Sequence, residues 1–386
     1  MEKNFILPRK MVPAAIILTA IGLAAVIAGL LSDPSRTWSN ILFSNFFFLT
    51  ISIGALLFYS IQYITGSEWS VIIQRIPLSL GAYLPVAAIV MLLMYFGLPQ
   101  VYEWAHPGIT QTDEVIAHKS AFLNVPFFMT RILIYFGLWI SLAMVLFRLA
   151  VQEDRNPGQY YYEKSAFYAK AFIFAAAILF SFAAVDWIMT IDAHWYSTLF
   201  GFRIMVTSIY FAVAAIVLIL LFLRSMGYLP QLREAHRHDL ARYLFRFSIV
   251  YGYLWFMQFL IIWYANIPET VIYYKPRFQG EWQPLFYADL FLNFVIPFVV
   301  LMSDNLGRRK PVLFTISSLL IIGLWVSLFQ QIMPGSYGPL RIGFIEVGMW
   351  LGFLGIFLLL TFYSLSRMAL VPVNHPLIGS SVHHHL

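Results

Sequence analysis

Two carboxylates and one imidazole occur within nine residues near the middle of the chain, at Asp186, Asp192 and His194. Burial raises the pKa of a carboxyl group toward that of imidazole, so such a set can accept a proton and pass it on. Trp187 and Trp195 lie in the same segment. Tryptophans next to an apolar run are also typical of an aromatic belt at the level of the lipid headgroups. In that interpretation Asp186 and Asp192 would face water. The segment therefore fits both a proton relay and an interfacial belt.

Five charged side chains fall inside stretches that are otherwise apolar: Arg131, Lys170, Asp186, Asp289 and Glu346. A charge in hydrocarbon is costly unless it is paired or hydrated, so each is a functional candidate. Lys170 can reach the membrane surface with its long stem. For Arg131, pairing with a carboxylate and binding a ligand are alternatives. We expect the three acids to contact water or polar partners rather than lipid.

Asp289 and Asn293 are four residues apart and share one face of a helix. This pair fits a hydrated interior stripe, and it fits equally a hydrogen bond to a neighbouring helix. Tyr135, Tyr168 and Tyr251 are candidate hydroxyl relays along a proton path. Most tyrosines in a membrane protein pack in the interior or lie at the interface, so these three are the weaker part of the prediction.

Cysteine is absent, which excludes disulfides, thiolate-bound iron–sulfur clusters and covalent attachment of c-type haem. The histidines fall in expected loops and in the tail, at His106, His118, His194, His236, His238, His375 and residues 383–385. A haem held between helices needs imidazoles inside the bilayer. We therefore expect this chain alone to bind no haem, iron–sulfur cluster or tightly held metal, and the triple histidine to be a disordered surface tail.

Membrane helices must position these side chains. Of the 386 residues, 61% are apolar and 11% are charged, whereas soluble domains have roughly 45–50% and 25%. Mean hydropathy is +0.78. These values predict an all-α integral membrane protein. The net charge of +6 is modest, so nucleic acid is not an expected partner.

Apolar runs of about 20 residues, the length of a membrane-crossing helix, occur ten times in the chain. The expected spans are residues 13–31, 41–65, 79–97, 125–151, 165–191, 200–226, 240–266, 284–303, 311–333 and 340–368. The first run is too long for the apolar core of a secretory signal, so we expect a retained helix. The whole chain, residues 1–386, is expected to form one membrane domain.

The basic residues predict the orientation of the chain. Of the 24 lysines and arginines, sixteen lie on the side of the N-terminus and two lie inside spans. The six on the other side are Arg36, Lys119, Arg203, Lys275, Arg277 and Arg341. Both termini are therefore expected to be cytoplasmic. Two aromatic and acidic stretches, residues 186–198 and 263–270, then face the opposite compartment and are a candidate docking surface.

These two stretches, together with His375-Pro376-Leu377 and the histidines at 383–385, carry a resemblance to a known family. The sequence resembles the quinol-subunit-like membrane proteins of bacterial Alternative Complex III. That complex has two large membrane subunits, and the resemblance is to the smaller one. They belong to the polysulfide-reductase membrane-subunit (NrfD-like) superfamily. The resemblance covers essentially the whole chain. It implies two four-helix bundles with two further helices.

The resemblance further implies a respiratory quinol:cytochrome c oxidoreductase complex in the bacterial cytoplasmic membrane. Its partners would be a larger sister membrane subunit, an iron–sulfur subunit and c-type haem subunits, and a terminal oxidase could follow. Menaquinol would be the substrate, and the haem c and iron–sulfur clusters would lie on the partner subunits. In this family the quinol site lies in the larger sister subunit. For the present chain the resemblance implies quinone contact, a proton pathway, or both.

Two other classes of function remain open from the residues. A secondary transporter is conceivable because Pro85, Pro126 and Pro297 interrupt expected spans. Transporters usually show internal repeats with paired broken helices, and the sequence has no such pattern. The third class is a structural scaffold that anchors redox subunits.

Overall fold

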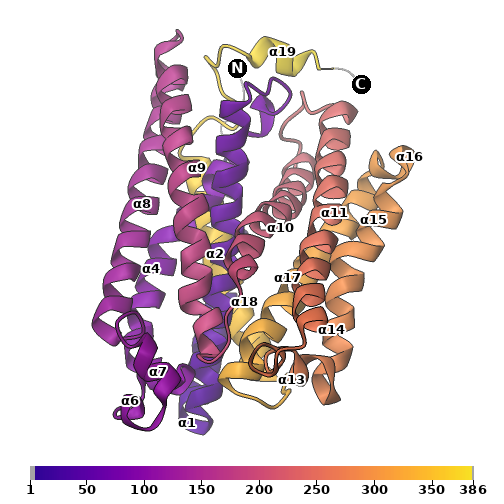
Figure 1. Ribbon diagram of the computed structural model, residues 1–386. Helices are drawn as coiled ribbons and strands as arrows, with labels where there is room; N and C mark the ends of the chain where they lie inside the picture. Colours follow the sequence, from indigo (N-terminus) through magenta and orange to yellow (C-terminus); the bar gives the residue numbers. More distant parts are fainter. Residues whose placement is uncertain (1–4, 385–386) are drawn as a thin grey trace.

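The computed structural model describes residues 5–384 (Figure 1). Within this range there is no β-strand, and ten helical segments are long and apolar enough to cross a membrane. They are Met11–Ser32 (α1), Pro34–Ile64 (α2), Val71–Val101, Val125–Arg155 (α8), Tyr160–Ile191, Thr198–Ser225 (α10), Glu234–Ala265 (α11), Gly280–Leu301, Lys310–Ser336 (α17) and Phe344–Ser366 (α18). The predicted all-α membrane fold with ten spans is confirmed.

Three of these segments are not continuous α-helices. The segment Val71–Val101 contains a 3₁₀ turn at Val71–Ile73, α3 (Arg75–Leu80), a 3₁₀ turn at Gly81–Tyr83, α4 (Leu84–Leu93), a 3₁₀ turn at Met94–Gly97 and α5 (Leu98–Val101). In Tyr160–Ile191 a 3₁₀ turn at Met189–Ile191 follows α9 (Tyr160–Trp187). The segment Gly280–Leu301 contains a 3₁₀ turn at Gly280–Trp282, α14 (Gln283–Leu290), a π-helical turn at Phe291–Val295 and α15 (Ile296–Leu301). The short helices outside the spans are α6 (Ile109–Thr112), α7 (Glu114–Lys119), α12 (Pro268–Val271), α13 (Tyr274–Phe278), α16 (Asp304–Gly307) and α19 (Ile378–Val382).

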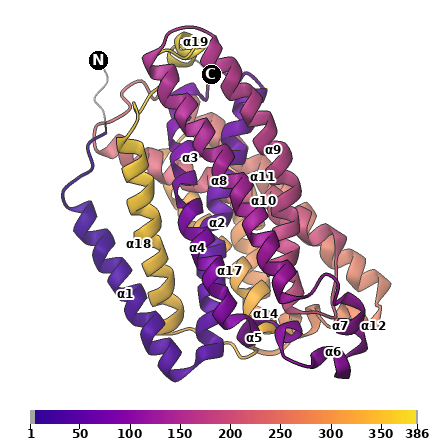
Figure 2. The ribbon, with the colours of Figure 1, turned by 90° about the vertical axis from the view of Figure 1, so that its left-hand side faces the viewer.

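The ten spans form two four-helix bundles and one outlying pair. Bundle A consists of α2, α3–α4, α8 and α9, and bundle B consists of α10, α11, α14–α15 and α17. The bundles lie side by side and are joined where α10 packs along α2 (Figure 1). Helices α1 and α18 pack against each other at one side (Figure 2). This arrangement confirms the expected two bundles with two further helices.

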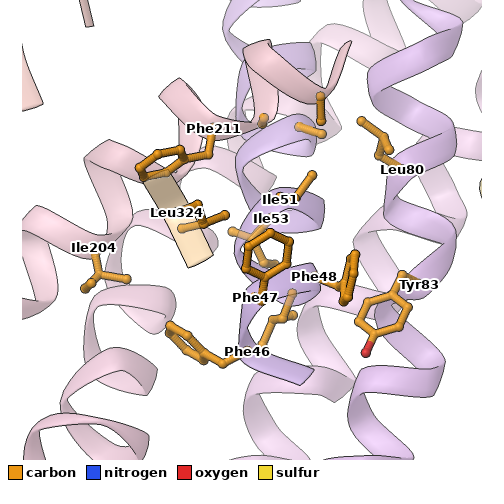
Figure 3. Close-up of a cluster of buried hydrophobic side chains, with 14 of the residues drawn as sticks. Phe46, Phe47, Phe48, Ile51, Ile53, Leu80, Tyr83, Ile204, Phe211 and Leu324 are labelled. Carbon is orange, nitrogen blue, oxygen red and sulfur yellow. The ribbon is translucent and has the colours of Figure 1, made fainter. Parts of the chain in front are cut away.

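Helix α2 is the centre of the fold because its entire apolar stretch is buried. Its consecutive residues Phe46, Phe47 and Phe48 point in different directions (Figure 3). Phe46 packs on Phe180 of α9, whereas Phe47 and Phe48 pack on Trp350 of α18 and Phe48 also contacts Tyr83 of bundle A. Helix α2 also begins earlier than the sequence predicts, at Pro34 instead of residue 41, because Asp33 caps it and only that residue separates it from α1.

Small residues allow the outlying pair to form. A Cβ atom on Gly22 of α1 would lie 2.4 Å from the Cα atom of Gly352 on α18, so neither position can hold a larger residue without separating the helices. Such close contacts drive helix association in lipid, where apolar burial gives no advantage. The opposite face of α1 is exposed and apolar, with Ile16, Ile17 and Leu23 each more than half exposed.

Helix α1 begins and α18 ends at the same end of the bundles, where α19 also lies (Figure 2). We call this end the inner end, following the predicted cytoplasmic orientation, and the end with residues 102–124 and 267–283 the outer end. The orientation itself stays a prediction.

Candidate functional site

Asp186 lies near the outer end of bundle A, in the last turn of α9, and is 1% exposed. Arg131 and Tyr135, one turn apart on α8, both contact its Oδ2 atom: the arginine Nε lies 2.7 Å away and the tyrosine hydroxyl donates at 2.7 Å. The Arg131 guanidinium also donates to the carbonyl of Phe122 at 3.0 Å and packs on that ring. The carboxylate is thus held in place by a buried ion pair and one hydroxyl, which we call the bundle A network.

The interfacial-belt interpretation is wrong for both tryptophans of this segment. Trp187 is 0% exposed and packs on Tyr135 and other rings inside bundle A. Trp195 is 2% exposed and stacks on Tyr273 with 3.8 Å between ring centroids. Only Tyr196, at 64% exposure, has the position expected of a belt residue. The segment folds into the protein because a 3₁₀ turn at Met189–Ile191 breaks the helix just after the aspartate.

Asp192 and His194 lie at the outer surface, each with its own partner. The Asp192 carboxylate lies 3.2 Å from the guanidinium of Arg277. The His194 Nε2 atom lies 2.7 Å from a carboxylate oxygen of Asp113, whose pKa is lowered mainly by the backbone amide of Ile116. Neither residue contacts Asp186, so the structure does not join these three residues into the single relay that their spacing indicates.

Asp289 is the centre of a second network, in bundle B, and is 0% exposed. Its Oδ1 atom accepts hydrogen bonds from the Tyr251 hydroxyl at 2.6 Å and the Asn293 amide at 2.8 Å. Its Oδ2 atom accepts from the Trp255 indole at 3.1 Å and lies 3.9 Å from the guanidinium of Arg203. The contact between Asp289 and Asn293 confirms that the two share one helical face.

The π-helical turn that follows Asp289 contributes to this geometry. Such turns are rare and often occur at functional sites. Here it contains Asn293, whose amide also donates to the carbonyl of Gly323 at 3.0 Å. A Cβ atom on Gly323 would lie 2.0 Å from the Asn293 side-chain oxygen. A glycine is therefore needed at position 323 for the Asn293 side chain to approach the backbone of α17 and hydrogen-bond to it.

The bundle B network continues toward the outer surface through α17. The Tyr251 hydroxyl lies 3.0 Å from the hydroxyl of Ser327, and the Gln331 amide donates to that same hydroxyl at 3.0 Å. The backbone carbonyl of Gln331 accepts from Arg277 at 3.1 Å, and Arg277 in turn pairs with Asp192. A series of polar groups, in which the step from the side-chain amide to the backbone carbonyl lies within Gln331 itself, therefore leads from the buried Asp289 to a carboxylate that is 24% exposed. We call it the outer chain.

The outer chain ends at a hollow in the outer surface. This cavity of about 310 Å³ is lined by Asp192 and His194 and by Glu103, His106 and Ser336, among others. The lining of the cavity thus contains two carboxylates and two imidazoles. Sequence spacing indicated a link from Asp192 to Asp186, but the contacts link Asp192 to Asp289.

Glu346 has a different role from the other two buried acids. It lies in the first turn of α18 and receives two parallel hydrogen bonds from Arg36, both at 2.7 Å. Asn40 donates to it at 3.0 Å, and the Gly343 amide donates at 2.8 Å. These contacts cap α18 and tie it to α2. All three intramembrane acids thus have polar partners inside the protein, as expected.

Besides Glu346 and His194, which have their own partners, two further proposed path residues lie outside both networks. Lys170 is exposed on α9 and makes no ion pair or hydrogen bond with residues 5–384. Tyr168 is half-buried and contacts the ring of Phe167, but its hydroxyl has no hydrogen bond within the described range. Lys170 therefore fits a side chain that reaches the membrane surface, and neither residue belongs to the candidate site.

A third group of buried charges lies at the inner end of bundle A, and no motif in the sequence indicated it. Arg75 lies 2.7 Å from a carboxylate oxygen of Asp154 and 3.8 Å from Glu153, which is 0% exposed. His375 of the C-terminal segment is 2% exposed and packs against Tyr63. Burial lowers the pKa of His375 to about 4, so its imidazole is neutral at physiological pH.

The prediction that every histidine lies in a loop or a free tail is wrong. His236 and His238 occupy the first turns of α11 and are buried, next to the carbonyl of Ser381 and the carboxylate of Asp304 respectively. At the tail, His384 Nε2 lies 2.7 Å from Asp239, while residue 385 is outside the described range. No group of three or more possible metal ligands occurs among residues 5–384.

The arginines of the site are what sequence reasoning missed. Arg36, Arg203 and Arg277 were counted only as basic residues of the outer side, yet all three pair with carboxylates, and Arg203 and Arg277 are almost fully buried. No pattern in the sequence marks these pairs, because 310 positions separate Arg36 from Glu346 and 85 positions separate Arg277 from Asp192.

Comparison of the sequence with models of known protein families gives no match, and comparison with curated proteins also gives none.

Proposed function

We propose that this chain is a membrane subunit of a respiratory quinol:electron-acceptor oxidoreductase, in which it provides a proton half-channel to the outer side. The observation that carries the proposal is the outer chain from Asp289 to Asp192. A buried carboxylate at its inner end is hydrogen-bonded to a tyrosine, and two hydroxyls and an amide lead from it to a surface ion pair. The carboxyl and hydroxyl groups of this chain can both donate and accept a proton, whereas the Gln331 amide nitrogen and the Arg277 guanidinium only donate hydrogen bonds, so the half-channel requires water to carry the proton past these two residues.

The resemblance in sequence to the membrane subunits of Alternative Complex III supports the respiratory part of this proposal. On this view menaquinol is oxidised in the complex, while the iron–sulfur clusters and haem c lie on partner subunits, because this chain has no cysteine to bind them. The protein lies in the bacterial cytoplasmic membrane. Its outer surface, with the cavity beside Asp192, faces the redox subunits that it anchors.

Affinity purification of the full chain from its native membrane in mild detergent tests the proposal. We expect the preparation to show haem c absorbance and to reduce a c-type cytochrome with menaquinol. The variant Glu163→Gln, an exposed acid at the inner end of α9 and away from the outer surface, should purify in the same way as the wild type. A colourless, monodisperse chain that moves a solute into vesicles would contradict the proposal and favour a transporter.

A further inference from the structure

A groove opens on the side of the molecule toward the surrounding membrane. Its floor is formed by α3, the turn at Gly81–Tyr83 and α4, and its walls are α8 on one side and α18 on the other. These elements lie next to one another on the face shown in Figure 2. The groove has a volume of about 480 Å³, which is within the range of pockets that hold small ligands. It has no residue in common with either network.

The walls of the groove are apolar over a length that suits one leaflet of a membrane. Ile140, Met144 and Phe147 line it from α8, and Leu360 lines it from α18. At ~1.5 Å per residue, the stretch from Ile140 to Arg148 measures ~12 Å. Half of a hydrocarbon core of ~30 Å is ~15 Å. The groove can therefore hold acyl chains along most of the depth of a single leaflet.

Two arginines lie at the inner end of this groove. Arg148 on α8 is exposed and makes no ion pair or hydrogen bond with any described residue. Arg367 follows the last turn of α18, donates to the Tyr363 hydroxyl and lies 4.7 Å from the centroid of that ring. No carboxylate lines the groove. Two positive charges above an apolar surface are therefore left without a counter-charge from the protein.

We propose that the groove binds an anionic phospholipid, with its phosphate between Arg148 and Arg367 and its acyl chains along α4, α8 and α18. Guanidinium groups match phosphate oxygens in geometry and charge, and anionic lipids are attracted to basic residues at the membrane surface. Tyr363 holds one of the two guanidinium groups in place before the lipid arrives. A quinone would fill the same apolar walls but offers no negative charge for the two arginines.

Native mass spectrometry of the purified full chain, released from micelles that contain phosphatidylglycerol or phosphatidylcholine, tests this site. We expect one phosphatidylglycerol to be retained in preference to phosphatidylcholine. The double variant Arg148→Gln/Arg367→Gln should lower the affinity for phosphatidylglycerol roughly 30-fold, since each arginine near the surface contributes about a fivefold factor. The matched control is Arg309→Gln/Lys310→Gln, an exposed basic pair at the inner end that lies outside the groove.

Three results would overturn the proposal. The first is equal retention of the two lipids by the wild-type protein, and the second is an equal loss of phosphatidylglycerol in the control variant. The third is a quinone, or the helix of a partner subunit, in the groove of the intact complex. Folding of the double variant is checked by its elution as a single species at the wild-type position, so a loss of lipid can be assigned to the site.

Discussion

Removing the charge of Asp186 should destabilise the protein, because Arg131 would then be a buried cation without a counter-ion. Arg131 is 6% exposed, and within residues 5–384 Asp186 is its only carboxylate partner. Breaking a buried ion pair by removing one partner typically costs about 3–5 kcal/mol. The change Asp186→Asn keeps an oxygen that can accept from Tyr135, and the carbonyl and ring of Phe122 still contact the guanidinium. We therefore expect a loss at the low end, about 3 kcal/mol.

A double-mutant cycle measures this energy. Unfolding of the purified chain by titration with sodium dodecyl sulfate in mixed micelles gives the free energy of unfolding for Asp186→Asn, Arg131→Gln and the double variant. Each single change should cost about 3 kcal/mol, and the double change should cost less than the sum by about 2 kcal/mol. The control Lys170→Gln, on the exposed side of α9, should stay within about 0.5 kcal/mol of the wild type. The reasoning would be refuted if the losses of unfolding free energy in the two single variants add up in the double variant, or if either single change costs less than about 1 kcal/mol.

Three further predictions concern packing, pH and topology. Gly323→Ala should lower the free energy of unfolding by about 1–3 kcal/mol, since its methyl group collides with an asparagine of the bundle B network, whereas Gly137→Ala has open space and should be neutral or slightly stabilising by the same titration. His375 stays neutral in the folded protein down to about pH 4, whereas in the unfolded chain it binds a proton below about pH 6.5. The free energy of unfolding should therefore decrease as the pH is lowered from about 6.5 to about 4, by up to about 3 kcal/mol. The variant His375→Phe should lose this dependence, and an unchanged slope would contradict it. Reporter enzymes fused after Arg309 and after Thr270 should read cytoplasmic and periplasmic respectively; any other result means that the orientation is inverted or the spans are miscounted.

Hydropathy was sufficient to predict the ten spans, because a run of about 20 apolar residues has few alternatives to a membrane helix. The same physics identified Asp186, Asp289 and Glu346, since a carboxylate in an apolar run demands a partner. The identity of the partners was largely beyond the sequence. Tyr251 and Asp289 are 38 positions apart, and Arg277 and Asp192 are 85 positions apart. Only the packing of α11 on α14, and of α13 beside the outer turn, brings these pairs together.

Residues at span ends were the main source of error. The expected second span began after Arg36, and Arg203 was counted with the basic residues of the outer side, although both arginines lie in the first turns of helices and pair with buried acids. Similarly, the spacing of residues 186–194 indicated one local relay. The 3₁₀ turn after Asp186 instead directs Asp192 toward Arg277, so neighbours in sequence belong to different networks.

The central claim is that the outer chain carries protons, and the variant Tyr251→Phe tests it most directly. This change removes the hydroxyl between Asp289 and Ser327, while Asp289 keeps its contacts with Asn293, Trp255 and Arg203. The measurement is the number of protons released on the outer side per menaquinol oxidised, in vesicles that contain the purified complex.

The control is Tyr168→Phe, which removes a tyrosine hydroxyl that has no hydrogen bond within the described range. We predict that Tyr251→Phe assembles with its normal haem content but releases fewer protons per menaquinol or releases them more slowly, while Tyr168→Phe equals the wild type. Unchanged proton release in an assembled Tyr251→Phe complex would contradict the account.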